Sequence, residues 1–202
     1  MKKIIAGIFF FCVFIIICFA LYQIFSAEKQ VKDTLEMAEQ LVELGQEQNQ
    51  NMQVEVSQSE NAMKFHEDEI MGILRVPKIN KNLPIIAGTD EDNLEKGVGH
   101  YTGTALPTEG EQIVLSGHRD TVFKEFEKLE SGDTFVVELT YGKFTYEIRE
   151  TEIVDADDVS VIRPRGEEVL TVTTCYPFHY VGNAPERFIF YAYPVDEKLL
   201  SL

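Results

Sequence analysis

The chain is poor in cysteine. It has three in 202 residues, and two of them, Cys12 and Cys18, lie inside an apolar run near the N-terminus, where free cysteine acts as a small hydrophobic residue. Cys175 is therefore the only thiol in the rest of the sequence. A single thiol excludes an intramolecular disulfide in that part, so Cys175 is either a reactive group or a buried bystander.

Positive charge is also scarce. Lys and Arg number 18 against 34 Asp and Glu, which gives a net charge of −16. A chain with this balance has no broad basic face to neutralise phosphates, so a nucleic-acid partner is excluded. Tight docking on an anionic membrane surface is disfavoured for the same reason. The acidic surplus is typical of a soluble, self-repelling exterior domain.

Long apolar runs are absent except for one, Ile4 to Phe25, which carries no charge. Its length is sufficient for a helix that crosses the ~30 Å hydrocarbon core. Lys2 and Lys3 precede the run, and the positive-inside rule then places the N-terminus in the cytoplasm and the following chain outside. A cleaved signal peptide, with Cys18-Phe19-Ala20 as a weak cleavage site, is the alternative. The run continues past Ala20, which favours an uncleaved anchor in the cell membrane.

The segment after the run changes character twice. Residues 28–45 show helical spacing of apolar positions, and Gly45 is the expected end of that helix. Residues 46–62 are polar and rich in Gln, Asn and Glu, which indicates a linker that lifts a domain from the membrane. We therefore expect three parts: a cytoplasmic tip and anchor (1–27), a helical and polar linker (28–63), and an extracellular catalytic domain (64–202).

The remaining sequence consists of short runs with strand character and little helical material. A Tyr-Gly pair at 141–142 indicates a hairpin, and Thr89 to Asp92 and Val122 to Leu129 indicate short helices. Many short strands with few helices predict a mostly β fold, either a closed barrel or a sandwich. The expected strands are Ile70–Val76, Leu83–Ile86, Gln112–Ser116, Thr134–Leu139, Lys143–Arg149, Val169–Thr174 and Arg187–Tyr193.

Two strand ends carry side chains that could take part in catalysis. One strand ends in Gly117 and delivers His118, and the other, Thr171-Val172-Thr173-Thr174-Cys175, ends in the lone thiol. A cysteine nucleophile needs a nearby base or cation to become a thiolate, and His118 can supply either. Acyl transfer also needs a donor for the oxyanion, for which Arg187, the backbone N–H of Cys175 and the Thr174 hydroxyl are candidates. Taken singly, each of these residues also has an ordinary structural interpretation.

The combination resembles a known family. The run that ends in Cys175 is similar to the Thr-Leu-X-Thr-Cys signature of sortases, with Val172 in place of Leu. The order His, Cys and then Arg about a dozen residues later also matches that family. Three blocks resemble class D sortases of Gram-positive bacteria in particular: Ser116-Gly117-His118-Arg119-Asp120-Thr121, Cys175-Tyr176-Pro177-Phe178 and Ala184-Pro185-Glu186-Arg187-Phe188.

The resemblance implies a closed eight-stranded sortase β-barrel with its active site at one rim. It implies that Cys175 attacks the Thr carbonyl of a sorting motif such as Leu-Pro-X-Thr-Gly in a secreted protein. His118 then exchanges protons with the leaving and incoming amines, and Arg187 supports the oxyanion or the motif. An amine of the cell-wall precursor resolves the thioester. Thr173, Thr174 and Asp120 are the expected supporting residues, although an N-cap for a helix near Phe123 is the simpler interpretation of Asp120.

Other polar residues rank lower as candidates. His179, close to Cys175 in sequence, is expected to line the substrate groove or to face solvent, and His66 and His100 are expected on the surface. Arg119 lacks the position that the family assigns to its arginine. The acidic runs at 90–92 and 155–158 lack a full calcium-binding loop, so we expect neither a metal nor a cofactor.

Three other functions remain open at this point. A pilin-type polymerising sortase would carry a second span and an inhibitory lid, neither of which is visible in the sequence. A secreted cysteine protease would use water as the acceptor. A membrane-tethered binding domain would need no intact Cys175, His118 and Arg187 set.

Overall fold

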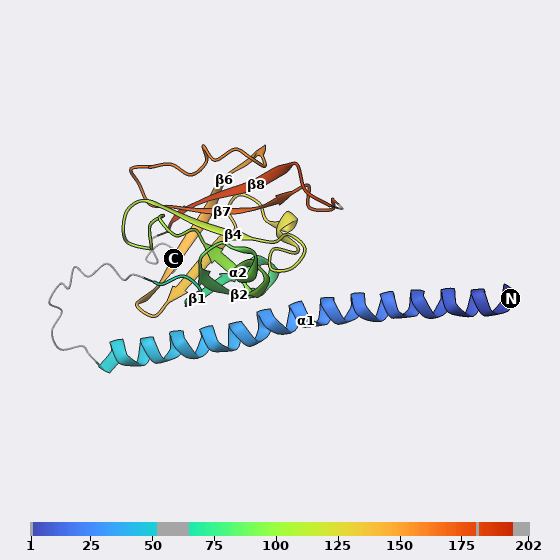
Figure 1. The fold of residues 1–202 in the computed structure, drawn as a ribbon. Helices are drawn as coiled ribbons and strands as arrows, with labels where there is room; N and C mark the ends of the chain where they lie inside the picture. The colour runs from blue at the N-terminus through green and yellow to red at the C-terminus, as the bar shows by residue number, and fades with distance from the viewer. Residues whose placement is uncertain (1, 52–64, 181, 196–202) are drawn as a thin grey trace.

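The computed structural model describes residues 2–51, 65–180 and 182–195. A β-barrel sits on one side of a long N-terminal helix (Figure 1). The elements are α1 Lys2–Asn51, β1 Ile70–Val76, η1 Pro77–Ile79, β2 Lys81–Ala87, α2 Glu91–Lys96, β3 Val98–His100, β4 Gln112–Gly117, η2 Phe126–Lys128, β5 Thr134–Leu139, β6 Gly142–Asp155, β7 Val169–Tyr176 and β8 Glu186–Pro194.

The strands close into a barrel in the order β1-β2-β3-β4-β7-β8-β6-β5. The β2–β3 and β4–β7 pairs are parallel and the other pairs are antiparallel. The predicted closed eight-stranded barrel is confirmed, as is the hairpin of β5 and β6, in which Leu139 pairs with Gly142. Strand β3 was not predicted, because three residues with a central glycine offer no alternation to recognise.

Aromatic side chains fill much of the barrel interior. Phe123, Phe126, Phe135 and Phe190 are all fully buried, and the rings of Phe123 and Phe126 stack with centroids 4.2 Å apart. Phe190 meets both Phe126 and Phe135 edge-on, at 6.1 and 5.9 Å. Such pairs add to the free energy gained from burying apolar area, so the interior gives the rim a rigid support.

Helix α1 has two unlike halves. In the first half most of the large apolar side chains described from Phe9 on are exposed, for example Phe10 at 72% and Phe19 at 62%. In the second half Ala38 and Val42 are buried against Ile73 of β1. In the described part of the chain, α1 is the one helix long and apolar enough to cross a membrane.

Gly45 is not the end of this helix, as was expected, because α1 continues through it to Asn51. A Cβ atom at residue 45 would lie 2.7 Å from atoms of Thr140, so glycine permits close contact between the helix and the β5–β6 turn. Residues 28–51 thus belong to the same helix as the apolar run, and part of them packs on the barrel. The rest of the expected polar linker, residues 52–62, lies outside the described residues, and the division into three parts stays a prediction.

The two predicted short helices differ in outcome. Helix α2 is confirmed, with the Asp90 carboxylate accepting a bond from the Asn93 N–H at 3.1 Å. The helix expected over Val122 to Leu129 is wrong except for the single 3₁₀ turn η2. Glu125 adopts a left-handed conformation (φ 77°), which an α-helix cannot accommodate.

Candidate active site

The register of three neighbouring strands brings the candidate residues to one rim of the barrel. In the parallel β4–β7 pair Gly117 lies opposite Thr174, so His118 emerges at the level of Cys175. In the antiparallel β7–β8 pair Cys175 lies opposite Arg187. Directly opposed residues project to the same face of a sheet. The structure therefore brings His118, Cys175 and Arg187 together from three separate chain segments.

The run that ends in Cys175 has two different faces. Val172 and Thr174 are buried toward the interior, and the Thr174 hydroxyl donates to the Gly117 carbonyl at 2.9 Å. That bond fixes the end of β4 to the end of β7, one residue before the candidate histidine and cysteine. Thr173 shares the outward face with Cys175, and both are half-buried. Cys175 is thus accessible and sits on a rigid strand.

Gly117 explains how His118 is placed. A Cβ atom at Gly117 would lie 2.7 Å from the Phe123 ring and 2.8 Å from Val122, so glycine lets the following turn fold back on the strand end. The Phe123 N–H donates to the His118 carbonyl at 3.0 Å and closes that turn. The backbone of His118 is therefore fixed, and its half-buried ring faces a cavity.

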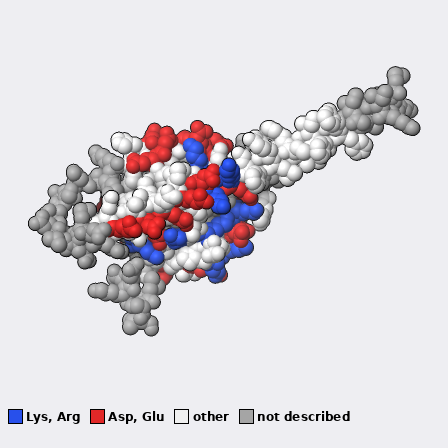
Figure 2. Space-filling model, turned by 90° about the horizontal axis from the view of Figure 1, so that it is seen from below, with Lys and Arg blue, Asp and Glu red and all other residues white. Residues whose placement is uncertain are grey.

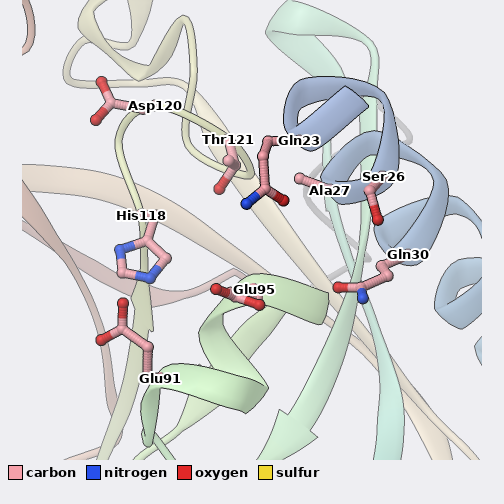
Figure 3. Close-up of a pocket in the computed structure, with 9 residues that line it drawn as sticks. All are labelled: Gln23, Ser26, Ala27, Gln30, Glu91, Glu95, His118, Asp120 and Thr121. Carbon is pink, nitrogen blue, oxygen red and sulfur yellow. The ribbon is translucent and has the colours of Figure 1, made fainter. Parts of the chain in front are cut away.

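The cavity beside His118 has a volume of about 380 Å³. Helix α1 forms one wall, helix α2 a second and the turn after β4 a third. Glu91 and Glu95 of α2 project toward the His118 ring (Figure 3). The lining residues are Gln23, Ser26, Ala27, Gln30, Glu91, Glu95, His118, Asp120 and Thr121. Because the α1 wall lies at the end of the apolar run and just beyond it, the cavity is level with the end of that run.

The Arg187 side chain bonds to the backbone just before it, at the start of β8. Its Nη1 donates to the carbonyls of Glu186 and Ala184 at 3.0 and 3.4 Å. Within the described ranges, Nε and Nη2 of Arg187 make no hydrogen bond, and no ion pair joins Arg187 to a carboxylate. The guanidinium therefore keeps donors available for an oxyanion or a peptide carbonyl.

The three candidate residues lie at neighbouring strand ends, but their side chains are not bonded to one another. Among the residues that the structure describes, no hydrogen bond or ion pair joins His118, Cys175 and Arg187.

Asp120 does not cap a helix, which was the simpler interpretation of the sequence. Its side chain is 75% exposed, and among the described residues its carboxylate accepts a hydrogen bond only from Arg119 Nε, at 3.4 Å. The N-cap interpretation is wrong, because no helix begins at this point and the turn closes on the His118 carbonyl instead. Asp120 lines the cavity and stays a supporting candidate on that ground alone.

Two of the other three histidines are exposed, and the third is buried. His179 and His66 are exposed, as expected. His100 was expected on the surface, but it is buried in β3, with Nε2 3.1 Å from the Ala105 carbonyl and 3.3 Å from the Thr104 hydroxyl. Burial lowers the pKa of His100 below its usual value. Sequence reasoning missed it because the three-residue strand that carries it gave no signal.

Arg119 was set aside at the sequence level, yet it is almost fully buried beside the candidate histidine. Its position next to His118 was the one available signal in the sequence.

Charge is unevenly spread over the surface. On the face seen in Figure 2, acidic side chains form several patches among uncharged residues, and basic side chains are more frequent toward the side from which the apolar part of α1 projects. Within the described ranges no three His, Cys, Asp or Glu side chains gather in a metal-binding arrangement. In the two acidic runs, Asp90 caps α2 and the Asp158 carboxylate accepts from the Ser160 N–H at 2.8 Å.

Comparison with known proteins gives the class to which this barrel belongs. The family model described as Sortase domain matches residues 74–195, well over half of the chain. The chain therefore belongs to the sortase family. Membership supports cysteine transpeptidase activity in general.

The resemblance to class D is confirmed. The chain is 56% identical to Sortase D of Bacillus subtilis (strain 168) over 137 residues, which cover 66% of this chain and 69% of that protein. It is 41% identical to the catalytic domain of B. anthracis SrtD, with a TM-score of 0.57, covering 71% of this chain and 97% of that one. A Clostridium perfringens Sortase D5 transpeptidase shares the fold, with a TM-score of 0.64 at 24% identity over 85% of this chain and 99% of that one.

Proposed function

We propose that this chain is a cysteine transpeptidase that cleaves a sorting motif of the Leu-Pro-X-Thr-Gly type after its Thr and transfers the new carboxyl end to an amine of the cell-wall precursor. The observation that carries the proposal is the register of β4, β7 and β8. It presents His118, Cys175 and Arg187 side by side at one rim, on strand ends that the Thr174–Gly117 bond ties together.

The reaction divides into two acyl transfers. The Cys175 thiolate adds to the Thr carbonyl carbon, and Arg187 donates hydrogen bonds to the oxyanion. The C–N bond then breaks, and the His118 imidazolium gives its proton to the departing amine. In the second half the acceptor amine adds to the thioester, its proton passes to His118, and the Cys175 thiolate leaves. Protons and electron pairs balance over the cycle, so no cofactor or metal is required.

The supporting residues act at some distance from the bonds that change. The Thr174 hydroxyl is already bonded to the Gly117 carbonyl, so its contribution is to align β4 with β7 rather than to hold the oxyanion. Thr173 lies on the same face as Cys175 and is available to the bound motif. Asp120 lines the cavity beside His118, where the incoming amine would approach.

We further propose that α1 anchors the enzyme with its N-terminus in the cytoplasm and the barrel outside. The exposed apolar side chains of its first half and the basic pair Lys2 and Lys3 support this orientation. Protease treatment of intact cells tests it directly. The barrel should be digested while a tag on the N-terminus stays protected, and protection of the barrel would reverse the orientation.

The activity test uses the full chain in detergent or lipid nanodiscs, because α1 packs on the barrel and lines the cavity. The protein is mixed with labelled sorting-motif peptides and candidate amines, and its intact mass is followed. We expect a peptide adduct on Cys175 that is lost when an amine is added, with formation of the amide product. Cys175→Ala should give neither, and a Cys12→Ala, Cys18→Ala variant is the matched control that should behave as wild type.

Other outcomes point to the other functions. Release of free acid at the same rate with and without amine indicates a protease. Transfer to a protein lysine but to no precursor amine indicates a polymerising sortase. If wild type and Cys175→Ala behave alike toward every motif, the proposed activity is wrong and a binding role remains.

A further inference from the structure

Arg119 is a buried guanidinium that bonds almost entirely to one loop. Its side chain is 5% exposed. Nη1 donates to the Pro177 carbonyl at 3.0 Å, and Nη2 donates to the carbonyls of Tyr180 and Gly182 at 2.7 and 3.0 Å. All three acceptors belong to the loop between β7 and β8.

The energetics favour a structural role for this charge within the loop. A buried guanidinium is very costly unless its donors are satisfied, and hydrogen bonds from a charged donor are stronger than neutral ones. The bond from Nε to the exposed Asp120 is long and contributes little. The hydrogen bonds to the three carbonyls therefore offset the cost of burying the Arg119 charge. Because the guanidinium is planar, these bonds also fix the curvature of the loop.

The loop has a second anchor, which is aromatic. The Phe178 ring lies 5.2 Å from Phe188 and 5.6 Å from Tyr176, centroid to centroid. These contacts fix the first part of the loop. The carbonyls of Tyr180 and Gly182 lie beyond them. Among the described residues, Arg119 is the only side chain that donates hydrogen bonds to this middle part of the loop.

Through these bonds, Arg119 links the segment that carries His118 to the β7–β8 loop. It directly follows His118, while the loop that it holds connects Cys175 to Arg187. We propose that Arg119 is a positioning residue, which fixes the β7–β8 loop to the His118 segment and so keeps His118, Cys175 and Arg187 in their mutual arrangement. The inference rests on the proposed function for its kinetic readout but not for its structural one.

The test compares two variants of the full chain. Arg119→Gln removes the charge and the fork, and Arg119→Lys keeps the charge but cannot reach three carbonyls with one planar group. Arg149→Gln is the matched control, since Arg149 is half-exposed, stacks on Tyr193 at 5.1 Å and lies on β6, away from the loop. Hydrogen exchange of the loop, turnover of a sorting-motif peptide and alkylation of Cys175 by iodoacetamide are measured on each.

We expect Arg119→Gln to speed amide exchange in the loop by about 10-fold to 100-fold, the range for losing charged hydrogen bonds, with no change in β1 and β5. The kcat for peptide should fall by about tenfold or more, because acylation needs all three residues in place. Alkylation needs the Cys175 thiolate but neither a bound motif nor an oxyanion donor, so it should change by less than about threefold. Arg119→Lys should lie between Gln and wild type, and Arg149→Gln should match wild type.

Several results would overturn the inference. Unchanged loop exchange in Arg119→Gln would show that the carbonyl bonds do not hold the loop. Equal acceleration of exchange in the loop and in β1 would show a general loss of stability instead. An unchanged kcat with a loosened loop would separate the loop from catalysis. If wild type turns over no peptide, the proposed function fails, whereas the exchange measurement still decides whether Arg119 holds the loop. If Arg119→Gln does not fold, Arg119→Lys decides the same questions.

Discussion

The interior of the barrel and its active-site rim are built from the same strands in different ways. On β7 and β8 the interior side chains Val172 and Phe190 are buried against apolar neighbours. At the rim, three residues along the same strands, Cys175 and Arg187 are half-exposed, and no hydrogen bond joins their side chains. Stability and chemistry are therefore separated along each strand, and substitutions at the two places should have different effects.

The largest effect is expected at the rim thiol. Cys175→Ala removes the nucleophile, so turnover of peptide should fall by roughly 10³-fold or more. The side chain is small and half-buried, so the melting temperature should change by less than about 2 °C. Activity and thermal unfolding of the full chain in detergent check both parts. A loss of several degrees would show that the rim is also a structural centre, which would break the comparison.

The opposite pattern is expected in the interior. Phe135→Ala empties a fully buried position that meets Phe126 and Phe190. It should lower the free energy of unfolding by about 3–5 kcal/mol while leaving kcat per folded molecule nearly unchanged. Urea unfolding measures the free energy of unfolding, and turnover with active-site titration measures kcat per folded molecule. Phe135→Leu is the milder control. If kcat falls in proportion to stability, interior and rim are not separable.

A third substitution tests the rim charge. Arg187→Lys keeps the positive charge but loses the planar fork that can serve a carbonyl or an oxyanion. Because removal of one oxyanion donor typically costs about 10²–10³-fold, kcat/KM should fall within that range with unchanged stability. Alkylation of Cys175 by iodoacetamide should stay near the wild-type rate. A large fall in alkylation would mean that Arg187 acts on the thiol rather than on the oxyanion.

The interior was more predictable from sequence than the rim. Strands such as Ile70–Val76 and Thr134–Leu139 were predicted with their observed bounds, because their composition and flanking turn residues are local signals. Strand β3 and the continuation of α1 through Gly45 depend on tertiary contacts, since β3 is defined by its partners and Gly45 by its contact with Thr140. No local pattern reports such contacts.

At the rim, the sequence indicated which residues to examine but not what they touch. His118, Cys175 and Arg187 were identified from strand ends and from the family resemblance, and the register then placed them together. Thr174 was a candidate oxyanion donor, yet its hydroxyl is bonded to Gly117. Arg119 was set aside because it lacks the position of the family's arginine. The bonds that bury it reach about sixty residues along the chain, so only the folded structure reveals them.

The smallest expected effect is on the pH dependence of stability, and it comes from a histidine in the interior and not from the one at the rim. His100 belongs to the interior, where burial lowers its pKa below the usual 6.5, whereas His118 belongs to the rim. A lowered pKa means that the fold favours neutral His100. Its contribution to stability is therefore complete above about pH 6.5 and is lost as the pH falls through the lowered pKa.

Protonation of His100 at acid pH should thus lower the free energy of unfolding. In His100→Gln, whose amide keeps a donor for the Ala105 carbonyl, the loss of unfolding free energy between pH 7 and pH 5 should be smaller than in wild type. Urea unfolding at a series of pH values measures this slope. His66→Gln is the control, because that side chain is exposed and should leave the slope unchanged. Equal slopes in wild type and His100→Gln would show that the buried histidine does not report on the stability of the interior.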